Sequence, residues 1–251
     1  MIGTMPGPVI FAHRGASAHA PENTLSSFRL AKEQGAEAIE LDVQITADME
    51  IVVFHDLTLN RVTNTSGKIS DYTLADLKKM DAGYAYGPAF QTERIPTLEE
   101  VFKEFSDFPL INVELKNFSP HTEKLPVLVA DIIHSYQMET RVLISSFNPK
   151  ALRNFNKLSS EILLGRLVHF PLTLRYFQLN PSQLDIYNSV HISYSVLNPH
   201  FIKYFHSKGK LVYTYTLNHP GDMIEALELG VDGFFTDDPG LAKRTIINSN
   251  N

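Results

Sequence analysis

The 251-residue sequence contains no cysteine. This absence excludes disulfide bonds, thiolate metal sites and cysteine nucleophiles, and it is typical of a protein that works in a reducing compartment. Residues 1–12 carry no lysine or arginine ahead of a short apolar stretch. We therefore expect neither a signal peptide nor a transmembrane span, and we expect a cytoplasmic location.

The chain also has few positive charges, and they do not form runs. It has 28 acidic and 22 basic residues, which gives a formal net charge of -6. Nucleic-acid binding requires clustered lysine and arginine, so no nucleic-acid partner is expected. Stable membrane association is not expected either, because the chain is negative overall and no strongly basic amphipathic helix is evident. The oligomeric state is left open.

The middle of the chain contains no linker rich in proline and glycine. Residues 107–157 show neither such a linker nor a break in composition. With 43% hydrophobic residues, the chain is long enough to bury one full core, and its length is typical of a single (β/α)8 barrel. We predict one α/β domain that spans residues 1–251.

Short apolar runs rich in β-branched residues alternate with helical patterns along the chain. This alternation is typical of parallel βα units. We predict eight barrel strands and one hairpin partner of the second strand, at residues 9–12, 38–45 (partner 51–54), 110–115, 141–146, 162–168, 190–194, 211–216 and 233–236. Eight parallel strands suit a closed TIM barrel.

Some helix ends can be recognised in the sequence. Asn23 or Thr24 can cap a first helix that ends before Gly35, and Thr97 with Glu100 forms a capping-box pattern. Residues 56–96 are too long for a simple βα loop and contain one short helical pattern at 71–80. We predict that this insertion is a small cap subdomain that walls the substrate pocket.

Three carboxylates lie where two neighbouring strands can bring them together. Glu40 and Asp42 are two residues apart in one strand, so they point to the same side, and Glu114 is near the end of the next barrel strand. Hard oxygen ligands without thiolates favour Mg²⁺ or Ca²⁺, with Mn²⁺ possible, whereas Zn²⁺ more often recruits histidine. The alternative is that these carboxylates are only solvated or paired with Arg14 and Lys116.

His13 and His55 each follow an apolar strand. Histidine accepts and donates protons near neutral pH, so two in one site would form an acid/base pair. Arg14 and Lys116, which are near the same strand ends, could bind an anionic oxygen. The alternatives are hydrogen-bonded structural histidines and simple salt bridges.

Together these residues resemble a known family. The chain contains, in order, His13-Arg14-Gly15, Pro21-Glu22-Asn23-Thr24, Glu40-Leu41-Asp42-Val43, His55-Asp56, Ile95-Pro96-Thr97-Leu98-Glu99-Glu100 and Glu114-Leu115-Lys116. This order and spacing is similar to that of the glycerophosphodiester phosphodiesterase family. The similarity continues to Asp237, so it covers nearly the whole chain.

The resemblance implies a TIM barrel with an insertion after the second strand unit. It also implies one divalent metal ion held by Glu40, Asp42 and Glu114, catalytic histidines at His13 and His55, and Arg14 and Lys116 near the substrate phosphate. Phe147 and Tyr215 are expected as pocket walls or as core residues. Many relatives carry tryptophan at the position of Tyr215, which leaves the shape of the alcohol pocket open.

The expected reaction is metal-dependent hydrolysis of a glycerophosphodiester to sn-glycerol 3-phosphate and an alcohol. The sequence does not assign which histidine is the acid, nor does it distinguish direct attack by water from a cyclic phosphate intermediate. A lysophospholipase D-like phosphodiesterase is one alternative. A non-catalytic barrel that binds phosphate esters is another, because a fold does not determine a function.

Overall fold

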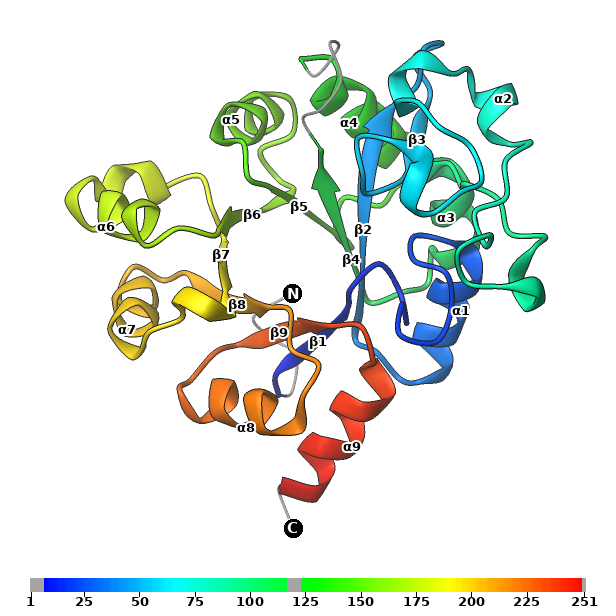
Figure 1. The fold of residues 1–251 in the computed structure, drawn as a ribbon. Helices are drawn as coiled ribbons and strands as arrows, with labels where there is room; N and C mark the ends of the chain where they lie inside the picture. The colour runs from blue at the N-terminus through cyan, green and yellow to red at the C-terminus, as the bar shows by residue number, and fades with distance from the viewer. Residues whose placement is uncertain (1–6, 117–122, 250–251) are drawn as a thin grey trace.

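The structure is a closed parallel barrel surrounded by helices (Figure 1). It is a computed structural model, which describes residues 7–116 and 123–249. The barrel strands are β1 (Val9–Ala12), β2 (Ala38–Ile45), β4 (Leu110–Leu115), β5 (Val142–Ser146), β6 (Leu163–Val168), β7 (Ser189–Ser193), β8 (Leu211–Tyr215) and β9 (Gly233–Thr236). The barrel closes because β1 pairs in parallel with both β9 and β2.

These strands confirm the predicted TIM barrel. Each predicted strand is present with bounds that differ by one residue at most, and the hairpin partner β3 (Ile51–Val53) pairs antiparallel with β2. All eight residues of β2 are buried, because the strand has a covered face on each side. Ile39 and Leu41 pack in the main hydrophobic core with residues of the surrounding helices, so Glu40 and Asp42, with the opposite parity, point into the barrel.

Helices cover the outside of the barrel (Figure 1). They are α1 (Leu25–Glu33), α3 (Leu98–Phe105), α4 (Leu125–Ser135), α5 (Pro149–Leu158), α6 (Pro171–Leu179), α7 (Pro199–Ser207), α8 (Pro220–Glu228) and α9 (Pro239–Ser249). Both predicted starts are correct: Thr24 caps α1 and Thr97 caps α3, each through a capping box. No helix in residues 7–116 and 123–249 is long and apolar enough to cross a membrane.

Aromatic side chains fill the inside of the barrel below its open end. Phe11 stacks on Phe235 with ring centroids 4.5 Å apart and meets Tyr213 edge-on at 4.8 Å. His191 is fully buried beside them, and burial lowers its pKa to about 3. The interior is therefore a packed core, and a cavity lined by described residues lies at the carboxyl ends of the strands.

The insertion between β3 and α3 has a small core of its own. Phe54, Leu59, Ile69, Leu77 and Ile95 are buried together there. Of the helical pattern predicted at 71–80, only α2 (Leu74–Leu77) is an α-helix, and a 3-10 turn precedes it at Ile69–Asp71. The predicted helix is shortened because turns, packed around this cluster, form most of the segment.

Candidate active site

A cavity of about 200 Å³ opens at the carboxyl ends of the barrel strands. Eight of the nine residues singled out by the sequence line it, namely His13, Arg14, Glu40, His55, Glu114, Lys116, Phe147 and Tyr215. The ninth, Asp42, is almost completely buried behind Arg14 and Lys116. The structure therefore brings together residues from five barrel strands and from the end of the hairpin strand β3.

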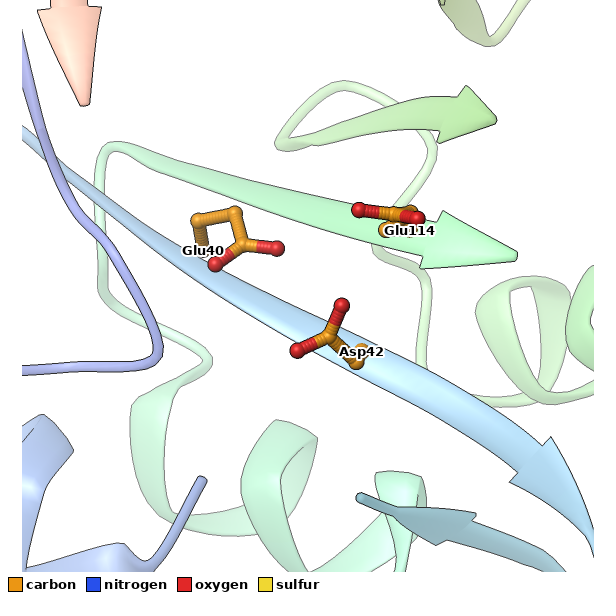
Figure 2. A group of neighbouring side chains, drawn as sticks. All are labelled: Glu40, Asp42 and Glu114. Atoms are coloured by element: carbon orange, nitrogen blue, oxygen red, sulfur yellow. The ribbon is translucent and has the colours of Figure 1, made fainter. Parts of the chain in front are cut away.

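The three carboxylates form a cluster (Figure 2). Glu40 and Asp42 come from β2 and Glu114 from β4, where Asp42 and Glu114 are direct neighbours in the parallel register. One oxygen from each side chain lies within 4.8 Å of the others. Figure 2 shows the carboxylates of the two strands facing a common space, which is the arrangement expected of a site for a hard cation.

Two cations neutralise part of this negative charge. Lys116 Nζ lies 3.0 Å from Asp42 and 2.8 Å from Glu114, and Arg14 Nε lies 3.5 Å from Asp42. Burial opposes ionisation of Asp42, but Lys116 and Arg14 lower its pKa below the usual range. Burial raises the pKa of Glu114 to about 7, although Lys116 partly offsets this effect. The predicted salt bridges thus exist alongside the carboxylate cluster.

Glu40 is the carboxylate of the three that forms no ion pair with a described residue, although the charge of Arg14 acts on it. It is buried, and the hydrogen bond to its Oε2 comes from the backbone N–H of Arg14 at 2.9 Å. Burial and the neighbouring charges of Asp42 and Glu114 raise its pKa well above the usual value. A divalent ion among the three carboxylates would remove this repulsion, so the donor set fits a hard metal ion.

The turn after β1 places Arg14 at the carboxylates. Arg14 and Gly15 both have left-handed backbone conformations, with φ of 56° and 84°. A Cβ atom at Gly15 would overlap Ser27, whose hydroxyl donates a hydrogen bond to the Arg14 carbonyl at 2.9 Å. The glycine of the His-Arg-Gly motif is therefore required both by its φ and by close packing.

His13 is held by an aspartate from the other end of the chain. Its Nδ1 lies 2.7 Å from Asp237 Oδ1, since Ala12 and Thr236 are register partners on β1 and β9. Ser17 and Asn218 donate further hydrogen bonds to the same carboxylate. Although burial opposes it, these hydrogen bonds lower the pKa of Asp237 to about 2, so it is a fixed anion behind the imidazole.

His55 is held in the same way, but in a more cationic environment. Its Nδ1 lies 2.6 Å from Asp56 Oδ1. Arg61 binds both Asp56 and Glu22. Burial lowers the pKa of His55; the charge of Asp42 opposes this effect and that of Lys116 adds to it, and the net shift favours the neutral imidazole.

The opposite wall of the cavity is apolar. Phe147 and Tyr215 line it and meet edge-on, with ring centroids 6.2 Å apart. The Tyr215 hydroxyl donates to the Val168 carbonyl at 3.0 Å, which fixes the ring. The site thus has one strongly charged wall and one aromatic wall.

The family model for the glycerophosphoryl diester phosphodiesterase family matches residues 13–241. The chain belongs to this family. It is 38% identical over 241 residues to the glycerophosphodiester phosphodiesterase of Caldanaerobacter subterraneus subsp. tengcongensis, with 96% of each chain covered. It is 37% identical to the glycerophosphodiester phosphodiesterase of Bacillus altitudinis, over 93% of this chain and 96% of the relative.

Among solved structures, a phosphodiesterase from Oleispira antarctica in complex with the product sn-glycerol-3-phosphate has a TM-score of 0.89. It is 33% identical, and the match covers 96% of this chain and 97% of that one. These relatives confirm the resemblance drawn from the sequence motifs. The protein is a phosphodiesterase of the glycerophosphodiester class.

That the insertion of this chain is a cap that walls the substrate pocket stays a prediction. None of residues 57–96 lines the cavity, whose described walls come from strand ends and from His55. The insertion instead contributes Arg61, which binds Glu22 and Asp56 behind the lining residues. The position of the insertion in the sequence predicts that it lies at the carboxyl end of the barrel. It does not predict which residues of the site the insertion contacts.

Sequence reasoning missed several residues of the site. Asn112, Ser145, Leu167 and Phe235 also line the cavity, and Asp237 supports His13. Asp237 had a recognisable signal, because closure of the barrel puts the residue after the last strand beside the residue after the first. Ser145 and Phe235 lie in segments that resemble the family, whereas Asn112 and Leu167 look like ordinary strand residues.

Proposed function

We propose that Glu40, Asp42 and Glu114 hold one divalent ion, Mg²⁺ or Ca²⁺ with Mn²⁺ possible, and that His13 and His55 carry out the proton transfers of glycerophosphodiester hydrolysis. The products would be sn-glycerol 3-phosphate and an alcohol. The single observation that carries the proposal is the buried carboxylate cluster, which opens into the same cavity as two aspartate-bound histidines.

The metal, when bound, supplies Lewis acidity and a template for the phosphoryl group. Arg14 and Lys116 line the same cavity and carry positive charge toward it. We infer that they stabilise the charge that develops on the phosphoryl oxygens. One such preorganised donor contributes about 10²- to 10³-fold in rate in other enzymes.

The two histidines are suited to different steps. Asp56 and Asp237 bind the Nδ1 atoms, which leaves each Nε2 as the atom that exchanges a proton with the substrate. Burial lowers the pKa of His55 and favours its neutral form, so it suits the base that activates the nucleophile. His13 would then protonate the leaving alkoxide. Each transfer is worth roughly 10²- to 10⁴-fold.

The direct test is release of glycerol 3-phosphate from glycerophosphocholine and glycerophosphoethanolamine in Mg²⁺, Mn²⁺, Ca²⁺ or EDTA. We expect metal-dependent turnover that His13→Ala and Glu40→Gln abolish. Glu50→Gln is the matched control, because Glu50 is exposed in the turn between β2 and β3. If the wild type hydrolyses neither ester with any metal, the substrate assignment fails and lysophospholipids are tested next.

We also propose a cytoplasmic location and a role in glycerol and lipid metabolism. The cysteine-free composition supports a reducing compartment. Cell fractionation followed by assay of the two esters tests the location.

A further inference from the structure

Positive charge is concentrated on one side of the barrel. Residues 147–210 contain eight lysines and arginines but only two acidic residues, a net charge of +6. The rest of the chain has 14 basic and 26 acidic residues, a net charge of -12. Residues 147–210 include α5, α6 and α7, which follow one another around one side of the molecule (Figure 1).

The exposed cations on this side form no ion pairs with the described part of the chain. Six of them are exposed, namely Lys150, Arg153, Lys157, Arg175, Lys203 and Lys208. None of the six forms an ion pair within residues 7–116 and 123–249, whereas elsewhere Arg29 pairs with Glu104 and Lys32 pairs with Asp107. Their charge is therefore available to an external anionic surface.

Helix α6 adds an exposed apolar face. Leu172, Tyr176 and Leu179 recur at helical spacing with 82%, 49% and 82% of their surface exposed. The buried side of the same helix is supplied by Leu174 and Phe177. An outer helix normally exposes polar residues on this side, so the apolar face is available to a partner.

The apolar face begins at the rim of the active-site cavity. Phe170, 66% exposed, immediately precedes α6, and Phe147 lines the cavity. Leu167, three residues before Phe170, also lines the cavity, and Arg166 Nη1 donates to the carbonyls of both Phe147 and Leu167. A surface bound along α6 would therefore lie beside the cavity opening.

We propose that this basic and apolar side, called here the α5–α7 face, docks reversibly on an anionic lipid surface. Basic residues attract phosphate headgroups, and each contributes roughly a fivefold gain in partition near such a surface. Exposed leucine and aromatic side chains then enter the boundary between headgroups and acyl chains. The negative charge of the rest of the chain makes the contact reversible and salt-dependent.

Two other occupants fit the α5–α7 face less well. A second copy placed symmetrically on the same face would bring like charges together, which is unfavourable. A nucleic acid would satisfy the cations but offers no apolar surface for Leu172 and Leu179. The lipid surface is the partner that satisfies both the charge and the apolar side chains.

The experiment is co-sedimentation of the full chain with vesicles of phosphatidylcholine, with and without 30% phosphatidylglycerol. We expect binding only to the anionic vesicles, and loss of binding at 0.5 M salt. Lys150→Glu with Lys157→Glu should weaken partition at least 25-fold, from about fivefold per cation. Leu172→Ser with Leu179→Ser should also weaken it without changing the charge.

Lys103→Glu and Tyr84→Ser are the matched controls, since both residues are exposed outside the α5–α7 face. All variants should hydrolyse soluble glycerophosphocholine at the wild-type rate, which shows that they fold and separates docking from the reaction proposed above. The proposal is overturned if anionic vesicles do not bind at low salt, or if the face variants bind as well as the controls. It is also overturned if sedimentation velocity shows a dimer that Leu172→Ser with Leu179→Ser dissociates.

Discussion

The charged residues of the site act in pairs. His13 and His55 each have an aspartate on Nδ1, and those aspartates are held by further donors. Glu40 accepts a backbone hydrogen bond from Arg14 but forms no ion pair with a described residue, so it is the carboxylate that a bound cation would stabilise most. At this scale chemistry depends on the immediate neighbours of each residue, and most of those neighbours are distant in sequence.

Asp237→Asn should lower kcat about 10²-fold with little change in KM, because an amide can no longer fix the tautomer of His13. Steady-state kinetics over pH 5–9 measure this, and the profile should change shape as well as height. Asp238→Asn is the control, since Asp238 binds the exposed His19. An unchanged profile for Asp237→Asn would mean that Asp237 only supports the fold.

Metal binding should weaken as pH falls. Burial raises the pKa of Glu114 to about 7 in the metal-free protein, so its proton competes with the ion. The same raised pKa means that the metal-free fold loses stability as pH rises from the ordinary carboxyl pKa of 4.5 through 7. We expect Mg²⁺ affinity about tenfold lower at pH 6 than at pH 8, measured by calorimetry in two buffers to count released protons. Equal affinities at both pH values would contradict the raised pKa.

The elements show where local sequence was sufficient. The helix start at Asn23 or Thr24, the capping box at Thr97 and the strand bounds were predictable because each depends on residues close together in the chain. The helix predicted at 71–80 was reduced to Leu74–Leu77, because contacts with Leu59 and Ile95 determine the path of the insertion. A local pattern could not show those contacts.

Gly15→Ala should destabilise the protein by at least about 2 kcal/mol and abolish activity, because the added Cβ has both an unfavourable φ and an overlap with Ser27. Urea unfolding and ester hydrolysis measure the two effects. Gly209→Ala is the matched control, with φ of 68° but no atom within 4 Å of the added Cβ. It should cost roughly 1 kcal/mol and leave activity unchanged, and equal effects of the two variants would refute the overlap.

At the scale of the whole molecule, barrel closure links distant parts of the sequence. Residues within or just after β1, β2, β3, β4 and β9 meet at one opening, so a ligand bound there contacts several βα units at once. Binding at such a site should stabilise the entire fold.

Mg²⁺ at 100 times its Kd should therefore add about 2.7 kcal/mol to the free energy of unfolding. For a chain of this size that corresponds to a rise in Tm of roughly 5–10 °C, measured by calorimetry at pH 8. Glu40→Gln should remove most of the rise, while Glu50→Gln should keep it. A rise of equal size in both variants would place the ion elsewhere.

The sequence by itself determined the barrel, the family and the set of charged residues at the strand ends. These follow from alternating apolar patterns and from linked motifs, which are local properties of the chain. Only the tertiary structure decided that Asp237 supports His13, that the insertion supports the site from behind, and that the positive charges gather on the α5–α7 face. The physical reason is that barrel closure and helix orientation determine which residues become neighbours in space. The net charge of -6 is a sum over the whole chain and does not show where the positive charges lie.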